Sequence, residues 1–273
     1  MSPARAAAIA GATDPGKVRL NNEDTFVYDE SLGLLLVADG MGGHNSGEVA
    51  AELAAKTILD FARQSAKIEP PGAPLPGLSA SARRLEFFIK HANSLIYEKG
   101  RQFPRDAGMG TTVVAAFVGP EVLTVAHVGD SRLYLWRRGA LTALTQDHSL
   151  VAEQVRSGQI TAEEAARSNL QNILTRALGA EADVKVDVSE HALQAGDIVV
   201  LATDGLFKMV SDGEVEKIVG ARAQAHPKEI VDALIARACA AGGVDNVTVV
   251  AARIQEDAPE GGVKGLVSRL FTR

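Results

Sequence analysis

The sequence predicts an α+β fold, and the order of its predicted elements carries this prediction. Strand-like apolar runs come first, two long helical patterns follow, and a series of short β-type runs occupies the middle of the chain. A strand, two helices and a final strand complete the body. This order differs from the regular strand–helix alternation of a doubly wound parallel sheet.

The first half of the chain contains two predicted strands and two predicted helices. Residues 4–12 and 24–38 have the apolar content of β-strands, and a polar loop joins them. Residues 46–66 form a long helical pattern after a glycine-rich turn. The proline-rich residues 69–77 can form neither a helix nor a central strand. Apolar residues then recur at helical spacing over residues 85–96.

The second half is dominated by short strands. Residues 111–145 contain β-type runs separated by Gly-Pro, Gly-Asp and Arg-Gly-Ala, as in an antiparallel meander. Residues 149–170 are polar and helical in tendency, as an insertion between strands would be. The remaining predicted elements are strands at 184–192, before Asp204 and at 247–254, and helices at about 212–220 and 227–241.

Four aspartates stand beside apolar runs that are far apart in the chain. Asp39, Asp130 and Asp204 each follow such a run, and Asp245 stands just before the run VTVVAARI. A single Asp-Gly pair after a strand more often makes a turn, so the prediction rests on the four together. Because a buried strand delivers its neighbouring residue to a sheet edge, we expect the carboxylates to gather. Gathered carboxylates repel each other unless cations lie between them, and the pattern therefore predicts a metal site.

The residue types around this site indicate which metal it binds. The predicted ligands are oxygen atoms, and the sequence shows no cluster of His or Cys at zinc-ligand spacing. Hard oxygen ligands favour Mg²⁺ or Mn²⁺. Two such ions close together can lower the pKa of a shared water and stabilise an in-line phosphoryl displacement.

Composition excludes several other classes of protein. The net charge of −6 and the pI of about 5.6 argue against general affinity for nucleic acids, since no basic stripe appears in the body of the chain. The single Cys239 excludes an internal disulfide. The N-terminus is too weak for a secretory signal, and no apolar run is long enough to cross a bilayer. We therefore expect a cytoplasmic protein without a transmembrane segment.

Eight segments, taken in order, strongly resemble the metal-dependent protein Ser/Thr phosphatases of the protein phosphatase 2C (PPM) family in its bacterial form. They cover about residues 6–254, and their combination is far more specific than any one of them. The segments are RLNNED (19–24), VADGMGGHNSGE (37–48), GMGTT (108–112), AHVGDSRLYLWRRG (126–139), LTQDHS (144–149), LTRALG (174–179), GDIVVLATDGL (196–206) and DNVTVV (245–250).

The resemblance implies a ligand for each metal ion. Asp39 matches the aspartate that bridges two metals, and the backbone carbonyl of Gly40 matches a ligand of one of them. Asp204 and Asp245 match the residues that hold the second metal. Bacterial members often bind a third ion, and Asp130 matches the aspartate that shares this ion with the Asp204 position.

The resemblance also implies roles for residues of the RLNNED loop. Arg19 matches the arginine that binds substrate phosphate, and its planar guanidinium suits two phosphate oxygens. Glu23 matches an acidic residue that orients metal-bound water. Asp24 either shares this role or is a polar residue that opens a strand. Eukaryotic members read Asp-Gly-His where this chain reads Asp39-Gly40-Met41, so the proton donor stays unassigned, with His44 and a metal-bound water as the alternatives.

The family implies a β-sandwich of two antiparallel sheets flanked by helices, in an α-β-β-α order. We expect one phosphatase domain over residues 1–255, with a mobile flap at about 149–170 that selects protein substrates. The implied reaction is hydrolysis of phosphoserine and phosphothreonine in proteins by a metal-bridging hydroxide, without a phospho-enzyme. The implied cofactors are two Mn²⁺ or Mg²⁺ ions, with the third in some members.

The expected partners are phosphoproteins, including a bacterial Ser/Thr kinase and its substrates, and the expected state is a monomer. Three rival functions are a catalytically idle scaffold, a phosphatase of a partner-switching pathway, and a metal-dependent nuclease. The sequence favours none of them: the ligands are intact, there is no room for a sensory domain, and the chain is acidic. Residues 256–273 are a linker and a short amphipathic tail, which either docks on a partner or membrane or packs on its own domain.

Overall fold

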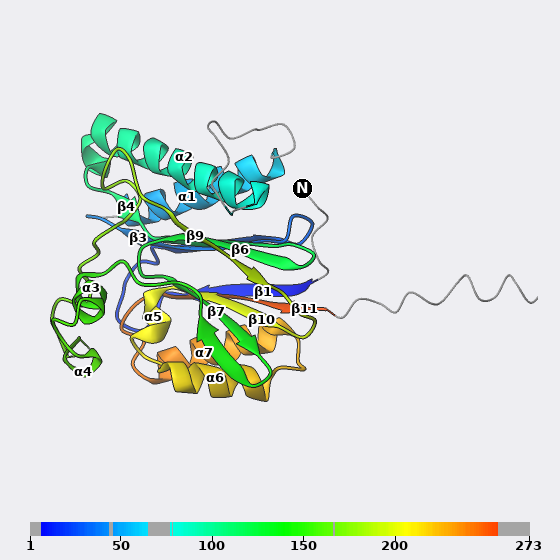
Figure 1. Cartoon of the computed structure of the whole chain (residues 1–273). Coiled ribbons are helices and arrows are strands. Elements are labelled where there is room, and N and C mark those ends of the chain that lie inside the picture. The colour runs from blue at the N-terminus through cyan, green and yellow to red at the C-terminus, as the bar shows by residue number, and fades with distance from the viewer. Residues whose placement is uncertain (1–6, 44–45, 65–76, 78, 166, 256–273) are drawn as a thin grey trace, which may run out of the picture.

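A computed structural model of the chain shows two β-sheets packed face to face, with helices on both outer faces (Figure 1). This arrangement is the α-β-β-α sandwich that the sequence predicts. The structure describes residues 7–43, 46–64, 77, 79–165 and 167–255.

Within these residues the strands form two sheets in which every pairing is antiparallel. The first sheet has the order β1-β11-β10-β7-β8 and the second β2-β3-β5-β6-β9, with β4 paired to β3. The first sheet contains β1 (Ala7–Asp14), β7 (Arg132–Arg137), β8 (Ala140–Ala143), β10 (Ile198–Ala202) and β11 (Val247–Ile254). The second contains β2 (Asp24–Asp29), β3 (Leu34–Met41), β4 (Gly110–Thr111), β5 (Val113–Val118), β6 (Val122–Val128) and β9 (Asp187–Ala192).

The helices cover the outer face of each sheet and one end of the sandwich. The pair α1 and α2 lies over the second sheet, α6 and α7 lie over the first, and α3 and α4 lie at the end where α5 begins (Figure 1). The helices are α1 (Ser46–Arg63), α2 (Ala80–Gln102), α3 (Leu150–Arg156), α4 (Ala162–Ala165), α5 (Asp204–Phe207), α6 (Asp212–Ala221) and α7 (Pro227–Ala240), with a 3-10 turn at Pro104–Asp106.

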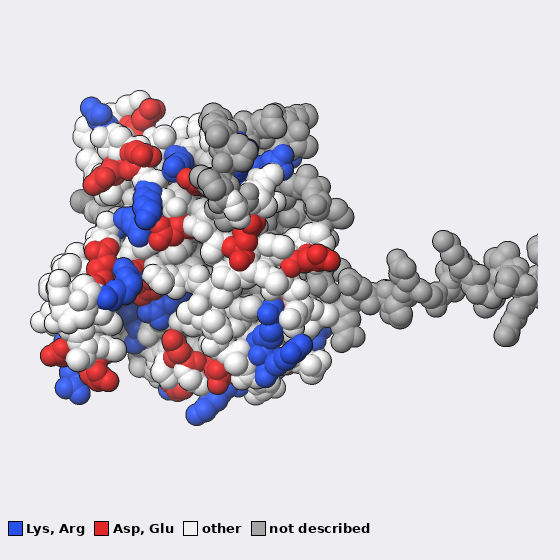
Figure 2. All heavy atoms as spheres, viewed as in Figure 1, with Lys and Arg blue, Asp and Glu red and all other residues white. Residues whose placement is uncertain are grey.

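The outer surface carries charges of both signs. On the face shown in Figure 2, the basic and acidic side chains of the described residues are interspersed rather than gathered by sign. Among the described helices, none has the length and apolar content that a membrane crossing requires.

The central strands are buried on both faces, and the side chains of each alternate between two cores. In β3, Leu34 and Leu36 point toward α1 and α2, whereas Leu35 and Val37 point toward the other sheet. This alternation follows from the two-residue period of a strand. Because both faces are covered, the strand sequence LLLVA is continuously apolar.

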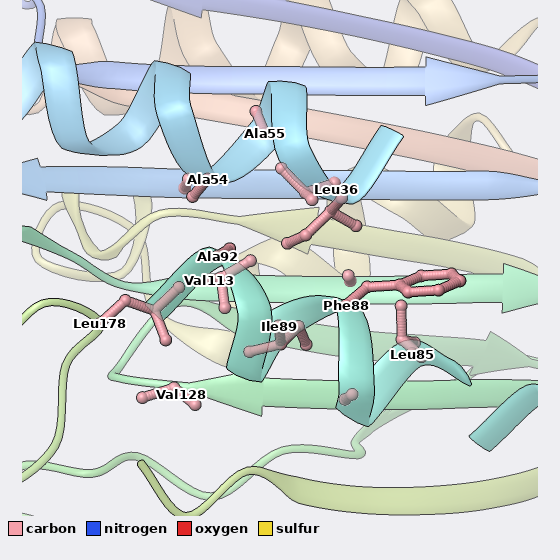
Figure 3. Close-up of a cluster of buried hydrophobic side chains, with 14 of the residues drawn as sticks. Leu36, Ala54, Ala55, Leu85, Phe88, Ile89, Ala92, Val113, Val128 and Leu178 are labelled. Carbon is pink, nitrogen blue, oxygen red and sulfur yellow. The ribbon is translucent and has the colours of Figure 1, made fainter. Parts of the chain in front are cut away.

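The helix layer over the second sheet packs tightly against it. Leu36, Phe88, Ile89 and Leu85 are fully buried in one cluster, where small alanines of α1 bring the helix close to the sheet (Figure 3). We expect truncation of Leu36 to alanine to cost about 2–5 kcal/mol of stability, because a tightly packed site relaxes little around the cavity. This rigidity matters for function because Asp39 lies three residues further along the same strand.

Two details of the predicted strands are wrong. Residues 24–38 form two strands, because Asp29 accepts hydrogen bonds from Ser31 and Leu32 and Gly33 has a φ of +63°. These features make a turn between β2 and β3. The turn pairs the strands so that Asp24 lies directly opposite Asp39.

The predicted meander over residues 111–145 is also divided. Strands β5 and β6 pair in the second sheet, whereas β7 and β8 pair in the first. The chain crosses from one sheet to the other at Gly129–Ser131, where Gly129 has a φ of +108°. This crossing places Asp130 between the two sheets at one end of the sandwich.

His44 and the tail over residues 256–273 lie outside the described residues. The alternatives for the proton donor and for the tail therefore stay predictions.

Candidate active site

The structure brings together seven residues that the sequence analysis assigned to the site: Arg19, Glu23, Asp39, Gly40, Asp130, Asp204 and Asp245. They line one cavity of about 230 Å³ at the end of the sandwich, between the two sheets. The lining includes five carboxylates and two cationic side chains: Glu23, Asp39, Asp130, Asp204 and Asp245, with Arg19 and Lys208. The other lining residues are Gly40, Met41, Gly42, Thr112, Asn172, Leu174 and Asn246.

Asp39 is held in place through its backbone. Its N–H donates to the hydroxyl of Thr112 at 3.1 Å, and its carbonyl accepts from the Thr112 N–H at 2.8 Å. The Thr111 hydroxyl donates to the same carbonyl at 2.9 Å. The side chain thereby stays free to face the cavity, which is how a rigid strand positions a ligand.

Gly40 must be glycine because the backbone is crowded there. A Cβ atom at this position would collide with the carbonyl oxygens of Gly47 and Glu23. The Gly40 N–H donates to the Glu23 carbonyl at 3.0 Å, which ties β3 to the RLNNED loop. Absence of a side chain lets the main chain approach a bound group closely.

Asp204 and Asp245 lie next to the ends of neighbouring strands of the first sheet. Asp204 is the first residue of α5, just after β10, and Asp245 lies just before β11, which pairs with β10. A Cβ atom at Gly205 would collide with the carbonyl of Asn246, so the two segments also depend on a glycine for their close approach.

Asn246 is a supporting residue whose role the sequence analysis missed. Its side-chain amide donates to the carbonyls of Pro15 and Asn21 at 3.0 and 2.9 Å. Its side-chain oxygen accepts from the Glu23 N–H at 2.9 Å. These bonds fix the loop that carries Arg19 and Glu23 against the end of β11. The motif DNVTVV contains Asn246, but nothing in that string shows which loop it contacts.

The carboxylates of the cavity carry more negative charge than the site neutralises. Burial, and then the charges of Asp24 and Asp204, raise the pKa of Asp39 well above its usual range. Burial and the nearby Asp204 raise the pKa of Asp130 to about 7. Burial also raises the pKa of Asp204, although Lys208 opposes this shift. A cluster with such raised pKa values binds protons or other cations readily.

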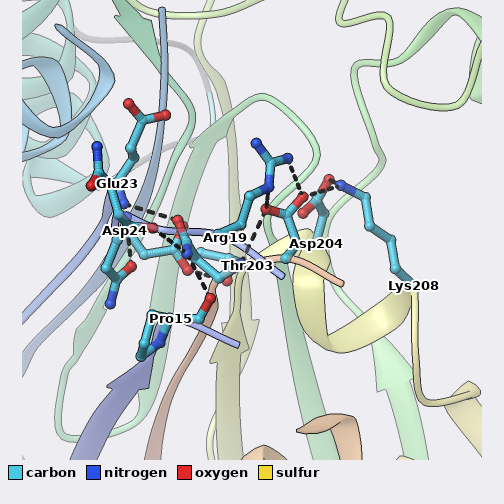
Figure 4. Close-up of polar contacts among 11 residues, drawn as sticks. Pro15, Arg19, Glu23, Asp24, Thr203, Asp204 and Lys208 are labelled. Atoms are coloured by element: carbon cyan, nitrogen blue, oxygen red, sulfur yellow. Dashed lines mark hydrogen bonds and ion pairs between the residues drawn. The ribbon is translucent and has the colours of Figure 1, made fainter. Parts of the chain in front are cut away.

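Two side-chain cations partly offset this charge (Figure 4). The Arg19 guanidinium pairs with both oxygens of Asp245, at 2.8 and 3.0 Å. The Lys208 ammonium lies 2.6 Å from Asp204 Oδ2 and 2.8 Å from Asp245 Oδ2. Lys208 was not predicted as a site residue, although its spacing of four residues from Asp204 places the two on one helical face.

The donor set fits a hard divalent cation. Oδ1 of Asp204 is buried and has no hydrogen-bond partner among the described residues. A buried carboxylate oxygen without a partner is costly, because it loses its water without compensation. The neighbouring oxygens of Asp39 and Asp245 are of the type that Mg²⁺ and Mn²⁺ prefer. The residues present therefore suit the metal that the sequence predicts.

Asp24 does not line the cavity, but it lies next to it, opposite Asp39 in the β2–β3 pair. It opens β2, is buried, and accepts a hydrogen bond from the Thr203 hydroxyl at 2.8 Å. Burial raises its pKa to about 7, and hydrogen bonds from Thr248 and Thr203 oppose this shift. Asp24 is thus a strand-opening residue that adds one more acidic group beneath Asp39.

A second group of polar residues lies beside the Gly129–Asp130 turn. The Gly129 N–H donates to His148 Nδ1 at 3.1 Å, and His148 Nε2 lies 3.2 Å from Asp187 Oδ2. Arg176 donates to Asp187 Oδ1 at 2.8 Å. The His127 ring stacks on His148 and contacts the Gln146 carbonyl at 2.9 Å. We call His127, His148, Asp187 and Arg176 the His–Asp cluster.

The His–Asp cluster contains residue types that can bind a metal, and its three ligand atoms lie within 4.8 Å of one another. Both ring nitrogens of His148 and Nε2 of His127 already make hydrogen bonds, however. His148 accepts through Nδ1 and donates through Nε2, and burial lowers its pKa to about 4, so the ring is neutral. His148 therefore supports the turn that carries Asp130.

A larger groove of about 710 Å³ adjoins the cavity. Asp130, Asn172, Asp204 and Lys208 line both spaces, so the groove opens directly onto the carboxylates. One wall is formed by residues of the predicted flap. The other is formed by strands of the first sheet and by the adjoining helices α5 and α6. The flap side comprises Ser149, Val151, Ala152, Val155, Arg156, Ala162 and Ala165, and the body side includes Arg132, Tyr134, Ala143, Phe207 and Asp212.

Comparisons with known proteins agree with this arrangement. The profile of the family described as protein phosphatase 2C matches residues 16–247. The Ser/Thr phosphatase stp of Listeria welshimeri is 36% identical over 248 residues, which cover 87% of this chain and 92% of that protein.

Solved structures show the same fold. The Ser/Thr phosphatase PstP/Ppp of Mycobacterium tuberculosis superposes with a TM-score of 0.81 at 34% identity, covering 92% of this chain and 99% of that one. The catalytic domain of PstP in complex with two manganese ions superposes with a TM-score of 0.78, at the same identity and coverage.

Fold and cavity define a sandwich-type phosphatase with an acidic centre. The chain belongs to the protein phosphatase 2C family. The family resemblance and the fold class that the sequence predicts are both confirmed.

Proposed function

We propose that this protein hydrolyses phosphoserine and phosphothreonine in other proteins with the help of two divalent cations, Mn²⁺ or Mg²⁺. The observation that carries the proposal is the cavity itself, in which five carboxylates face one another with only two cationic side chains among the described lining residues. The manganese complex of the PstP catalytic domain supports the choice of metal.

We carry the metal ligands over from the family resemblance. Asp39, the carbonyl of Gly40, Asp204 and Asp245 would hold the two ions, and Asp130 with Asp204 would hold a third. The cations would lower the pKa of a water held between them and neutralise charge on the phosphoryl oxygens.

The protein's own residues would bind the substrate and shape the reaction. Arg19 lies at the rim of the cavity with its side chain 54% exposed, so its guanidinium can contact an incoming phosphoryl group. Glu23 lines the cavity, so its carboxylate can orient a water molecule by accepting its hydrogen bond. Burial raises the pKa of Glu23, and the nearby Arg19 opposes this shift and favours the ionised form.

A phospho-enzyme on Cys, His or Thr is disfavoured in this cavity. Among the described residues lining the cavity there is no Cys or His, and the hydroxyl of Thr112 is hydrogen-bonded to Ser131 at 2.7 Å. Thr112 also accepts from the Asp39 N–H, so its oxygen is held in a structural role.

The groove beside the cavity suits a polypeptide that carries the phosphorylated residue. It is open, partly apolar and continuous with the carboxylates. We propose that the flap at about 149–170 belongs to one phosphatase domain over residues 1–255 and helps to select substrates. The proposed partners are phosphoproteins that include a bacterial Ser/Thr kinase and its targets, and we propose that the enzyme acts as a monomer in the cytoplasm.

An idle scaffold of the same fold would not need this cavity. The residues assigned to metal and phosphate lie together and face one space, and Asp204 retains an unsatisfied buried oxygen. A protein that had lost catalysis would be under no physical pressure to keep so many uncompensated charges, since they reduce stability.

The direct test is hydrolysis of para-nitrophenyl phosphate and of a phosphothreonine peptide, each with added Mn²⁺ and with EDTA. We expect activity with metal and loss of activity after full chelation, restored when Mn²⁺ is returned. Activity that survives full chelation would refute the proposal. Hydrolysis of para-nitrophenyl phosphate but not of the phosphothreonine peptide would refute only the assigned substrate class.

A further inference from the structure

Lys208 occupies an unusual position in the cavity. It follows α5 directly, and its ammonium contacts two carboxylates, Asp204 at 2.6 Å and Asp245 at 2.8 Å. Its side chain is only 23% exposed. The ammonium therefore lies where two acidic ligands from neighbouring strands converge.

Other lysines of the chain make the same local pair without this setting. Lys56 with Asp60 and Lys228 with Asp232 have the same four-residue spacing and the same distance of 2.6 Å. Their side chains are 75% and 69% exposed, and water screens such pairs strongly. Lys208 differs because it is largely buried and contacts a carboxylate from a second segment, so its charge has a larger effect.

The carboxylates that Lys208 contacts are those assigned to the second divalent cation. An ammonium and a divalent cation cannot both occupy the same oxygens, and their like charges repel at short range. Oδ1 of Asp204 still has no partner, so Lys208 satisfies the cluster only in part. Arg19 contacts Asp245 as well, but among the described residues no other side-chain cation pairs with Asp204.

We infer that Lys208 is an internal cation that occupies the second metal position when no metal is bound and competes with the metal for Asp204 and Asp245. This inference rests on the proposed function, since it needs these two residues to be metal ligands. It predicts a metal-free protein that stays folded and a metal affinity that is weaker than the carboxylates alone would give.

The structure also provides space for Lys208 to move. Lys208 lines both the cavity and the larger groove, so its flexible side chain borders open volume on the groove side. Asp212 lines the same groove and is an acidic group on that side. Metal binding would thus transfer a positive charge from the cavity toward the space assigned to substrate.

The first test compares Mn²⁺ binding by the wild type, Lys208→Met and Lys56→Met, with isothermal titration calorimetry on protein stripped with EDTA. Methionine keeps the length of the lysine stem and removes its charge. We expect Lys208→Met to bind the weaker-held Mn²⁺ about tenfold or more tightly, because two charge-assisted hydrogen bonds no longer compete. Lys56→Met should bind as the wild type does, and its metal-free form should melt close to the wild type.

The metal-free form of Lys208→Met should melt at a lower temperature than the metal-free wild type. The difference should disappear when Mn²⁺ is saturating. Equal or weaker Mn²⁺ binding by Lys208→Met would overturn the inference, while Mn²⁺ binding by the wild type would still support the proposed function. A wild type that binds no Mn²⁺ would overturn both.

A second test uses the wild type and does not depend on whether a variant folds. Acetylation of lysines by an N-hydroxysuccinimide ester is followed by mass spectrometry, with EDTA and with saturating Mn²⁺. We expect Lys208 to react severalfold faster with Mn²⁺ because its ammonium has left the carboxylates, and Lys56 and Lys228 to react equally in both. Equal or slower reaction of Lys208 with Mn²⁺ would contradict the competition.

Discussion

The cavity and the His–Asp cluster are two polar regions built from distant segments, and they differ in how their charges are met. In the cavity, burial and mutual repulsion raise the pKa values of Asp39, Asp130 and Asp204. In the His–Asp cluster, burial opposes ionisation of Asp187, but hydrogen bonds from Arg176 and His148 outweigh it and hold the pKa at about 2. The cavity therefore needs further cations, whereas the negative charge of Asp187 in the His–Asp cluster is already met by hydrogen bonds.

This difference shows why residue type alone does not identify a metal site. The His–Asp cluster has residues that commonly bind metals, yet their hydrogen bonds are already satisfied. The cavity has only oxygen ligands, but it keeps uncompensated charge and an unpartnered buried oxygen on Asp204. Buried negative charge that lacks a hydrogen-bond or ion-pair partner is the better indicator of where a cation binds.

The largest expected effect comes from removing a charge in the cavity. Asp39→Asn and Asp204→Asn should each lower kcat for para-nitrophenyl phosphate by about two to three orders of magnitude, because each removes charge stabilisation at the reacting group. Initial rates at saturating Mn²⁺ measure this loss. Retention of near-wild-type rates by either variant would remove that residue from the site.

The matched control is a buried aspartate whose charge is met. Asp197 is buried and pairs with Arg137 at 2.6 Å, far from the cavity lining. Asp197→Asn should lose about 2 kcal/mol of stability because a charge-assisted pair is weakened, while kcat per folded molecule stays unchanged. A large loss of kcat in this variant would show that charge removal acts through the fold rather than through the site.

Gly40 and Gly43 are close in the sequence but differ in how crowded their surroundings are. Gly40→Ala places a methyl group against two backbone carbonyls, whereas a Cβ atom at Gly43 meets no atom within 4 Å. We expect Gly40→Ala to lower kcat by about tenfold to a hundredfold through displacement of Asp39 and its own carbonyl, and Gly43→Ala to change little. Equal kinetics of the two variants would contradict the close approach at Gly40.

Arg19 tests whether the rim of the cavity recognises phosphate. Arg19→Lys should raise KM for the phosphopeptide by about tenfold, because an ammonium cannot bind two oxygens in one plane. Arg63→Lys is the control, since Arg63 is similarly exposed and pairs with Asp29 outside the cavity. Steady-state kinetics of both variants decide the point, and an unchanged KM in Arg19→Lys would argue against phosphate binding there.

The last expected effect is a pH dependence of stability that has opposite sign in the two regions. The pKa of folded His148 is about 4, below its value of 6.5 in the unfolded chain. The unfolded chain therefore takes up a proton between these values, and stability from His148 is lost as pH falls from 6.5 toward 4. The raised pKa values of the cavity carboxylates act the other way, because the folded state then binds the extra protons.

Removing His148 should therefore change the slope of stability with pH. In EDTA, the contribution of His148 to the free energy of unfolding of the wild type falls between pH 6.5 and pH 4 because His148 takes up a proton on unfolding. For His148→Gln the loss of unfolding free energy over this range should be smaller by up to about 3 kcal/mol. Urea unfolding across this range measures the slope, which does not depend on any constant loss from the substitution. Parallel slopes in the two proteins would show that His148 does not titrate on unfolding.

Much of the site could be predicted from the sequence because its local signals were strong. Continuous apolar runs next to Asp39, Asp204 and Asp245 indicated buried strands, and oxygen-only ligands indicated the metal. Pairing of the strands could not be predicted, since it depends on contacts between distant segments. The crossing at Gly129–Ser131 and the support of Asp130 by His148 are consequences of that pairing.

Lys208 shows a different limit of sequence interpretation. Its spacing from Asp204 was visible, but three other lysines pair with an acidic residue at the same spacing on the helices that cover the sheets. Only the structure shows that the Lys208 side chain turns inward and also contacts Asp245. The turn before Gly33 was missed for a related reason, because apolar residues on both sides of it continued the pattern of one strand.

The pairing of β1 with β11 gives the molecule a definite polarity. Asp14 lies opposite Val247 near the cavity, and Ala7 lies opposite Ile254 at the other end of the sandwich. In Figure 1 the flap helices α3 and α4 lie on the left, and the chain leaves β11 on the right. Ala7 and Ile254 therefore both lie at the end of the sandwich remote from the groove. A chain shortened to start at Ala7 or to stop at Ile254 would have its new terminus on the side of the molecule opposite the substrate groove.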